Sequence, residues 1–210
     1  MRRAAFRATC YTPHSDSRVS TRTPEIVLVR HGETEWSRTG RHTGRTDVPL
    51  TEQGRREAEA VGVALRKRRF ALVLMSPLER AAETCRLAGM ADSAVRCDEL
   101  QEWDYGDYEG LKTIDIRRDH PGWTVWRDGV PGGETLAEVG ARVDRVIEEL
   151  RRTAGDVAVF AHGHLLRVLA ARWVGLESGA GRLLALDPGS ISVLGFERET
   201  AVIRSWNARP

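Results

Sequence analysis

Short, fully apolar runs alternate with amphipathic stretches along this chain, and that alternation restricts its fold more than any other feature of the sequence. Strands that are apolar on both faces are typical of a parallel sheet, and the stretches between them have the helical period that would cover such a sheet. The runs and stretches occupy residues 25–30, 51–69, 71–75, 134–153, 156–161 and 165–174. We therefore predict an α/β fold, a three-layer sandwich in which helices flank a mostly parallel central sheet.

Weaker signals complete the pattern. A helix that carries Arg80 follows Ser76-Pro77, a pair typical of a helix cap and first turn. A weak strand and two closing strands, which can form a hairpin, are predicted at residues 95–98, 190–196 and 201–205. The segment 103–133 is rich in Trp, Tyr, Gly, Asp and Pro and has one short helical pattern, near 112–119. We expect this segment to be a cap or insertion outside the core.

The first 24 residues differ from the rest of the chain in charge. They carry five Arg and one Asp, a net charge of +4 in a chain whose overall net charge is +2. They lack the apolar stretch of a secretory signal, so we expect a disordered leader, with an organellar transit peptide as the alternative. Residues 25–210 then form one domain, whose slightly negative charge does not suit nucleic-acid binding.

Cysteine usage and hydropathy restrict the setting of the protein. Cys10, Cys85 and Cys97 are odd in number and show no CxxC spacing, which is typical of free thiols in a reducing compartment. No apolar run approaches the ~20 residues of a membrane span. We expect a cytoplasmic protein with no membrane partner, and a homodimer is compatible with the sequence.

Reactive side chains follow three of the predicted strands. His31 comes directly after the first strand, Arg80 lies shortly after the second, and His162 comes directly after the strand at 156–161. Because ligands bind beyond the carboxyl ends of parallel strands, we expect these side chains to converge. Arg30 and Arg80 can donate to the equatorial oxygens of a phosphoryl group, and a neutral imidazole can attack its phosphorus.

The motifs around these residues resemble those of a known family. Arg30-His-Gly-Glu-Thr34, Ser76-Pro-x-x-Arg-Ala-x-Glu-Thr84 and His162-Gly163 resemble the signature of the histidine phosphatase superfamily, also called the phosphoglycerate mutase-like family. The resemblance runs from about residue 25 to residue 196 and implies the fold of that family.

The resemblance also implies roles for individual residues. His31 would be the nucleophile that becomes phosphorylated, and Glu102 would protonate the leaving group. Arg30, Arg80 and His162 would complete the phosphate pocket.

Other residues are implied to bind the substrate or to have no part in the chemistry. Ser37 stands where many members of the family have an asparagine that contacts the phosphate. Glu33 and Glu83 are expected to hold the pocket arginines in place. The expected substrate-binding residues are Ser37, Thr43, Gly44, Tyr105 and Gly163, and the expected bystanders are His42, His120 and His164, of which His164 can line the pocket wall.

The family contains phosphatases and mutases, and the sequence favours a phosphatase. The segment between Gly110 and Gly133 is short, and Pro131-Gly-Gly-Glu-Thr135 resembles an element of the phosphatase branch. Residues 102–110 and 160–167 are similar to mycobacterial acid phosphatases and to a fungal sedoheptulose-1,7-bisphosphatase. This similarity implies a small phosphorylated metabolite as substrate, a sugar phosphate or a sugar acid phosphate.

Two other functions stay open, phosphoglycerate mutase and a non-catalytic protein that binds a phosphorylated ligand. We expect no cofactor and no metal, because the chain has no HExxH motif. The nucleotide-binding motif GxxxxGK[ST] and the serine-hydrolase motif GxSxG are also absent from the sequence.

Overall fold

A six-stranded, mostly parallel sheet forms the centre of the computed structural model, which describes residues 23–210. The strand order is β3-β2-β4-β1-β5-β6, and only the pairs β1–β5 and β5–β6 are antiparallel. The strands are β1 (Ile26–Arg30), β2 (Leu72–Met75), β3 (Ala94–Arg96), β4 (Val157–Ala161), β5 (Ile191–Glu197) and β6 (Thr200–Ala208). Nearly all of the predicted leader, residues 1–22, lies outside the described residues.

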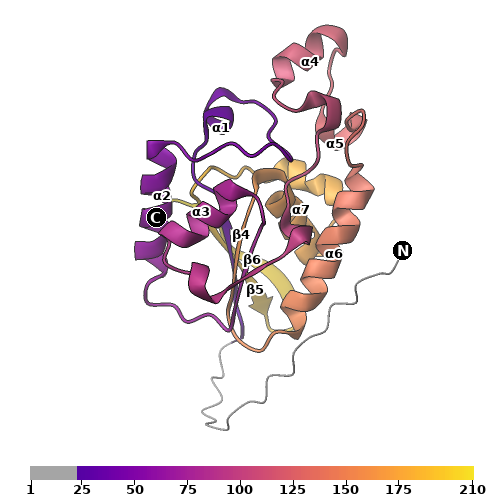
Figure 1. Cartoon of the computed structure of the whole chain (residues 1–210). Coiled ribbons are helices and arrows are strands. Elements are labelled where there is room, and N and C mark those ends of the chain that lie inside the picture. Colours follow the sequence, from indigo (N-terminus) through magenta and orange to yellow (C-terminus); the bar gives the residue numbers. More distant parts are fainter. Residues whose placement is uncertain (1–22) are drawn as a thin grey trace, which may run out of the picture.

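Helices cover both faces of this sheet, so the predicted three-layer α/β sandwich is confirmed (Figure 1). Two helices, α2 and α3, lie on one side, and α6 and α7 lie on the other, while α4 and α5 extend beyond one end of the sheet. The helices are α1 (Glu35–Thr39), α2 (Glu52–Leu65), α3 (Glu79–Leu87), α4 (Thr113–Asp119), α5 (Val125–Asp128), α6 (Leu136–Arg152) and α7 (Gly163–Trp173). Short 3-10 helices occupy Ala91–Ser93, Asp98–Leu100, Gly106–Tyr108 and Ser178–Leu183.

The strand β1 shows how the sequence builds the two cores. Its side chains alternate between the faces of the sheet, as the pleat requires. Ile26 and Leu28 pack in the cluster with α6 and α7, whereas Val27 and Val29 pack in the cluster with α2 and α3. Both faces are therefore buried, which is why the strand has no polar residue before Arg30.

Strand register brings the three predicted catalytic loops to one edge. Arg30 at the end of β1 pairs with Ala161 at the end of β4, and the His31 N–H donates to the Ala161 carbonyl at 3.0 Å. Met75 at the end of β2 pairs with Phe160. His31, Ser76 and His162 thus leave the sheet side by side.

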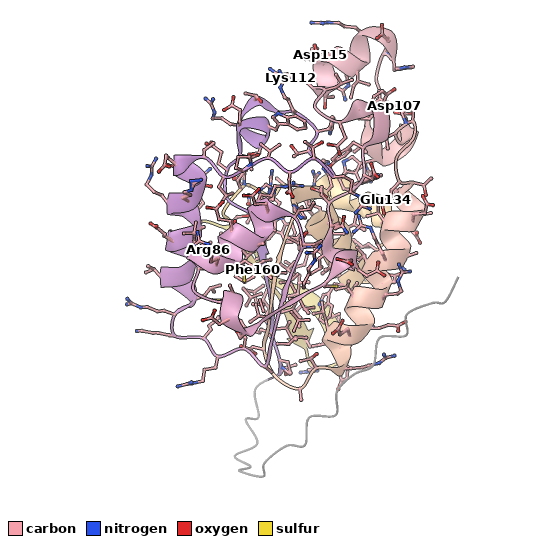
Figure 2. The ribbon with its side chains drawn as sticks, viewed as in Figure 1. Arg86, Asp107, Lys112, Asp115, Glu134 and Phe160 are labelled. Atoms are coloured by element: carbon pink, nitrogen blue, oxygen red, sulfur yellow. The ribbon has the colours of Figure 1, made fainter. Side chains whose placement is uncertain are left out.

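The segment 103–133 is more structured and more deeply buried than the sequence predicts. Besides the expected helix α4 it contains α5 and the 3-10 helix Gly106–Tyr108. Trp103 and Tyr105 are almost fully buried and, with Trp123, join the core cluster of α6 and α7. The expectation that the segment lies outside the core is wrong for these aromatics, because they pack at the interface between segment and sheet domain. Its outer part does project, as the labelled Lys112 and Asp115 at α4 show (Figure 2).

Two properties of the described residues bear on the setting of the protein. Cys85 and Cys97 are free, and burial raises the pKa of the Cys85 thiol to about 12, so this thiol is a poor nucleophile. Within residues 23–210, no helix has the length and apolar character needed to cross a membrane.

Candidate active site

His31 presents one ring nitrogen for chemistry. Its Nδ1 lies 2.8 Å from the carbonyl oxygen of Gly32, and a carbonyl can only accept, so Nδ1 carries the proton. The other nitrogen, Nε2, then has a free lone pair in the neutral ring. The residue is 4% exposed and lines a small cavity at the sheet edge.

The surroundings of His31 favour the neutral ring. Burial, followed by the positive charges of Arg80 and Arg30, holds the pKa of His31 well below its ordinary value of 6.5. An imidazole that stays neutral in mildly acidic solution is available as a nucleophile over a wide pH range.

The loop that carries His31 packs backbone to backbone against the start of α2. A Cβ on Gly32 would lie 2.2 Å from the Gly54 carbonyl oxygen, and a Cβ on Gly54 would lie 2.1 Å from the Glu33 carbonyl oxygen. The Gly32 N–H also donates to Thr84 Oγ1 at 3.1 Å. Only glycine allows this close approach, which fixes the backbone next to the reactive ring.

Replacing Gly32 with alanine is therefore expected to destabilise the protein by about 1–3 kcal/mol, because an added methyl group in a filled site forces backbone shifts. The shift would also move His31, so we expect activity to fall at least tenfold. Gly179→Ala is the matched control, because its Cβ would make only an ordinary 3.6 Å contact. Thermal melting together with phosphatase assays checks this; an unchanged melting temperature in Gly32→Ala would contradict it.

Arg80 is fully buried and ties the loop after α1 to the site. Its guanidinium donates to the carbonyl oxygens of Thr43 (3.2 Å), Gly44 (2.8 Å) and Thr46 (3.0 Å). Asp47 gives it a longer ion pair at 3.8 Å. Burial lowers the pKa of Arg80 from its ordinary 12.5, but an arginine remains charged near neutral pH.

Arg30 is held between the end of β1 and the start of α7. Its Nη1 donates to the Leu186 carbonyl oxygen. A Cβ on Gly163 would lie 3.2 Å from Arg30 Cζ, so the glycine leaves room for the guanidinium. Gly163 therefore belongs to the site through this close packing.

His162 lies next to His31, with ring centroids 5.2 Å apart, and is fully buried. Its Nε2 is 2.7 Å from Ser76 Oγ. Ser76 was expected to cap a helix, but α3 begins only at Glu79, and the Leu78 N-cap has no side-chain bond. The serine instead contacts His162, and burial, then Arg80 and His31, keep the pKa of His162 well below 6.5.

The site contains buried nitrogens that have no hydrogen-bond partner within the protein. Among the described residues, four buried side-chain nitrogen or oxygen atoms lack such a bond, and three of them are Arg30 Nε, Arg80 Nε and His162 Nδ1. An unpaired buried polar atom costs free energy, so such atoms concentrate where a ligand is bound. All three belong to residues predicted to surround a phosphoryl group.

Glu102 meets the first turn of α7 with its carboxylate. Oε1 accepts from the Trp103 and Leu165 N–H groups, both at 2.9 Å, and Oε2 accepts from the His164 N–H at 3.0 Å. Each carboxylate oxygen has two lone pairs, so Oε2 keeps one free. Glu102 also lines the cavity that contains His31.

The cavity brings the predicted binding residues to His31, with qualifications. Ser37, Thr43, Tyr105 and Gly163 line it, whereas Gly44 contributes its carbonyl to Arg80 instead. Ser37 Oγ already bonds the backbone of Thr34 as part of a helix-capping pair.

Four further lining residues were not predicted as substrate-binding, namely Arg41, His42, His164 and Arg167. His164 was expected at most to line the pocket wall, and it does so, 2.6 Å from the Tyr105 hydroxyl through Nδ1. Arg167 could have been anticipated, because it lies one helical turn after Gly163 on α7.

The expected role of Glu33 and Glu83 is wrong. Glu33 accepts a hydrogen bond from Thr51 Oγ1 at 2.8 Å, and Glu83 pairs with Arg55 at 3.3 Å. Neither contacts Arg30 or Arg80, whose partners are mainly backbone carbonyls. Glu33 and Glu83 belong to the same sequence motifs as Arg30 and Arg80, but they do not contact these arginines, because both carboxylates face α2.

No group of three or more His, Cys, Asp or Glu side chains that could hold a metal ion is found between residues 23 and 210. The absence of a metal requirement stays a prediction.

Comparison with known proteins adds independent information. Residues 26–209 match the model of the histidine phosphatase superfamily, branch 1. The chain is 41% identical over 189 residues to an acid phosphatase of Mycobacterium tuberculosis, covering 87% of this chain and 93% of that protein. It is 38% identical over 187 residues to the sedoheptulose 1,7-bisphosphatase of Saccharomyces cerevisiae, covering 73% and 69%.

Other similarities concern a mutase and a solved structure. A 2,3-bisphosphoglycerate-dependent phosphoglycerate mutase of Mesorhizobium japonicum is 41% identical over 166 residues, covering 69% of this chain and 78% of the mutase. The structure of a Mycobacterium tuberculosis protein superposes with a TM-score of 0.85 at 39% identity, over 90% of this chain and 99% of that one.

Proposed function

This chain belongs to the histidine phosphatase superfamily, and we propose that it hydrolyses phosphate monoesters of small metabolites through a phosphohistidine on His31. The predicted family is confirmed, and phosphatases among its relatives support the predicted class of enzyme. The roles of single residues, the cytoplasmic location and the homodimer stay predictions.

The observation that carries the proposal is the set of unpartnered nitrogens beside a neutral histidine. Arg30 Nε, Arg80 Nε and His162 Nδ1 are buried without a partner. A phosphoryl group has three equatorial oxygens that need donors as charge develops during transfer. We infer that these nitrogens donate to them while His31 Nε2 attacks the phosphorus in line.

Glu102 fits the role of proton donor to the leaving group. The free lone pair of Oε2 can hold a proton, and three backbone N–H groups fix the carboxyl group beside the His31 cavity. Once the phosphohistidine has formed, the same carboxylate can take a proton from the attacking water, as microscopic reversibility requires.

The size and lining of the cavity favour a small, polar and anionic substrate. The cavity has a volume of about 100 Å³, and besides His31 and His164 it is lined by Arg41, Arg167 and His42. Arginine forks bind carboxylates or phosphates, and imidazole nitrogens bind hydroxyls. A sugar phosphate or sugar acid phosphate offers these groups.

Phosphate release from a panel of sugar phosphates, measured with and without EDTA, tests this function. We expect release from at least one member of the panel and no effect of EDTA. Transfer between phosphoglycerates that exceeds release into water would favour the mutase. Binding of the panel without any turnover would favour a non-catalytic protein.

The low pKa of His31 leads to a prediction for the pH profile. Its neutral form persists below pH 6.5, so kcat/KM should hold as pH falls through that value and decline only at lower pH. An acidic limb at or above pH 6.5 would contradict the effect of burial, Arg80 and Arg30 on His31.

Arg80→Ala is expected to lower kcat by about 10²-fold or more, the scale of losing one preorganised donor to the transition state. Inhibition by vanadate or inorganic phosphate should weaken in parallel. Asp47→Asn is the control, since it removes the charge from the 3.8 Å ion pair but keeps an amide oxygen that can accept from the Glu79 N–H, so it should change the rate little. Unchanged phosphate affinity together with a normal rate in Arg80→Ala would show that the residue only anchors the loop.

A further inference from the structure

Arg142 is a charged residue on the buried face of α6. Its helical neighbours Val139, Val143 and Val146 are core residues, and its own side chain is only 7% exposed. A buried guanidinium is costly unless all its donors are used. Hydrophobic packing alone therefore does not explain why an arginine occupies this position.

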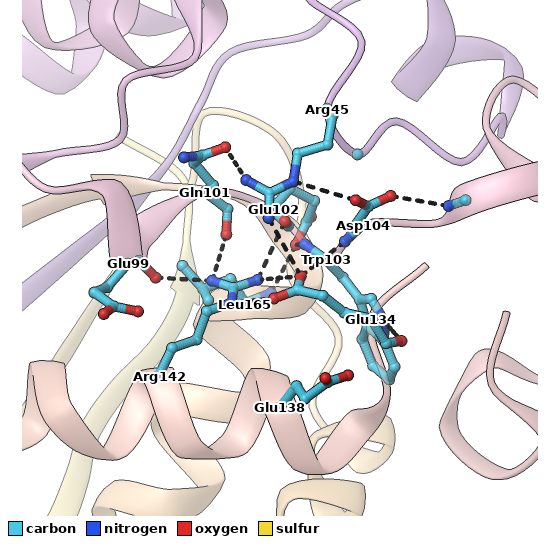
Figure 3. Close-up of polar contacts among 12 residues, drawn as sticks. Arg45, Glu99, Gln101, Glu102, Trp103, Asp104, Glu134, Glu138, Arg142 and Leu165 are labelled. Carbon is cyan, nitrogen blue, oxygen red and sulfur yellow. Dashed lines mark hydrogen bonds and ion pairs between the residues drawn. The ribbon is translucent and has the colours of Figure 1, made fainter. Parts of the chain in front are cut away.

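The Arg142 guanidinium donates hydrogen bonds to main-chain carbonyls of the loop that carries Glu102. Nη1 donates to the carbonyl oxygens of Glu99 and Gln101 at 2.7 and 2.6 Å, and Nη2 donates to that of Glu102 at 3.2 Å (Figure 3). Three carbonyls of four consecutive residues thus point at one side chain. This loop has only a single 3-10 turn, Asp98–Leu100, of its own.

Glu134 holds the same loop on the other side of Glu102, and Arg142 and Glu134 together are called the Arg142 clamp below. It pairs with Arg142 through both oxygens, at 2.9 and 3.0 Å, and its Oε2 also accepts from the Asp104 N–H at 3.0 Å. The Trp103 indole donates to the Glu134 carbonyl oxygen at 2.8 Å. Arg142 and Glu134 therefore grip the backbone on both sides of Glu102 (Figure 3).

We propose that Arg142 is a positioning residue for the proton donor: it fixes the main chain at Glu102 so that the carboxyl group meets α7 and faces the leaving group. The proposal rests on the proposed role of Glu102. Arg142 is not among the residues that line the His31 cavity, so it would act on Glu102 through the loop. A misplacement of about 1 Å at a reacting group can cost 10²-fold in rate.

The test compares Arg142→Lys with Arg145→Met on two substrates. Lysine keeps the charge opposite Glu134 but cannot span three carbonyls. Arg145 lies one turn further along α6 and binds the Glu99 carboxylate at 2.9 Å, with a side chain that is 58% exposed, so it is the matched control. The substrates are an alkyl phosphate, which needs a proton donor, and p-nitrophenyl phosphate, whose leaving group departs as a stable anion.

We expect Arg142→Lys to lose about 10–100-fold in kcat/KM on the alkyl phosphate, the range seen when supporting residues are removed, and less than about threefold on p-nitrophenyl phosphate. Arg145→Met should match the wild type on both. In Glu102→Gln, adding Arg142→Lys should cause no further loss on the alkyl phosphate, because the donor is already gone.

Three outcomes would overturn the proposal. Equal losses on both esters in Arg142→Lys would indicate a merely structural residue. Multiplying losses in the double variant would show that Arg142 acts independently of Glu102. If Glu102→Gln loses the same factor on both esters, Glu102 is not the proton donor and the role proposed for Arg142 fails with it. If Glu102→Gln loses more on the alkyl phosphate but Arg142→Lys loses equally on both esters, only the proposal for Arg142 is overturned.

Discussion

Replacing His31 with alanine is expected to abolish turnover, with a loss on the order of 10⁵-fold or more, as for other covalent nucleophiles. Without the imidazole, water must attack the phosphorus directly, and the two-step route through a phosphoenzyme is lost. The arginines and His162 would remain, so binding of inorganic phosphate should persist in the variant. Initial rates on the best sugar phosphate and on p-nitrophenyl phosphate, with phosphate affinity from competition or calorimetry, check this.

His120→Ala is the control for that experiment. His120 is an exposed histidine at the end of α4 and is predicted to have no part in the chemistry. Its variant should keep wild-type rates. If His31→Ala retained more than a few per cent of the activity on either substrate, His31 would not be the nucleophile.

The second large effect is expected for Glu102→Gln, and it should depend on the leaving group. Glutamine keeps the size of the side chain and can still accept hydrogen bonds, but it cannot give up a proton. General acid catalysis contributes about 10²–10⁴-fold, so we expect a loss of that order on sugar phosphates. On p-nitrophenyl phosphate the loss should be less than tenfold.

The hydrogen bonds of Glu102 set the structural control for this variant. One glutamine oxygen can replace Oε1 and its two donors, but the amide NH₂ would then face the His164 N–H. Leaving the His164 N–H without an acceptor costs about 1–3 kcal/mol, so a drop in melting temperature is expected. If both substrates slow by the same factor, Glu102 is not the proton donor, and Asp104 and Glu109 are the next candidates.

The fold and the centre of the site were predictable from sequence because both depend on short-range patterns. The apolar runs at β1, β2 and β4 identify buried strands, and parallel strands place their carboxyl ends together. His31 and His162 follow those ends directly, so their proximity follows from the topology.

Contacts between distant side chains could not be read from the sequence in the same way. The Ser76–His162 bond joins residues 86 positions apart, and the Arg142 clamp joins α6 to a loop about 40 positions earlier. Ser-Pro predicts a helix cap locally, and an arginine in an amphipathic helix predicts a solvated side chain. Here the tertiary contact prevails, because a buried donor or acceptor must find a partner wherever the fold offers one.

The burial of Trp103 and Tyr105 was missed for a related reason. A segment rich in Gly, Pro and Asp is typical of loops, and its aromatic residues were therefore placed outside the core. In the structure they fill the space between the loop and α7, where Tyr105 also reaches His164. The amino-acid composition of such a segment predicts its irregular backbone better than it predicts how deeply its side chains are buried.

Trapping the phosphoenzyme tests the central claim most directly. The protein is mixed with ³²P-labelled substrate and quenched within milliseconds in a denaturant. The quench contains no acid, because phosphohistidine is hydrolysed in acid. The labelled peptide is then mapped. We predict transient, acid-labile label on the peptide that contains His31 in the wild type, and none in His31→Ala. Label on a serine or cysteine, or label that persists in the variant, would contradict the phosphohistidine mechanism.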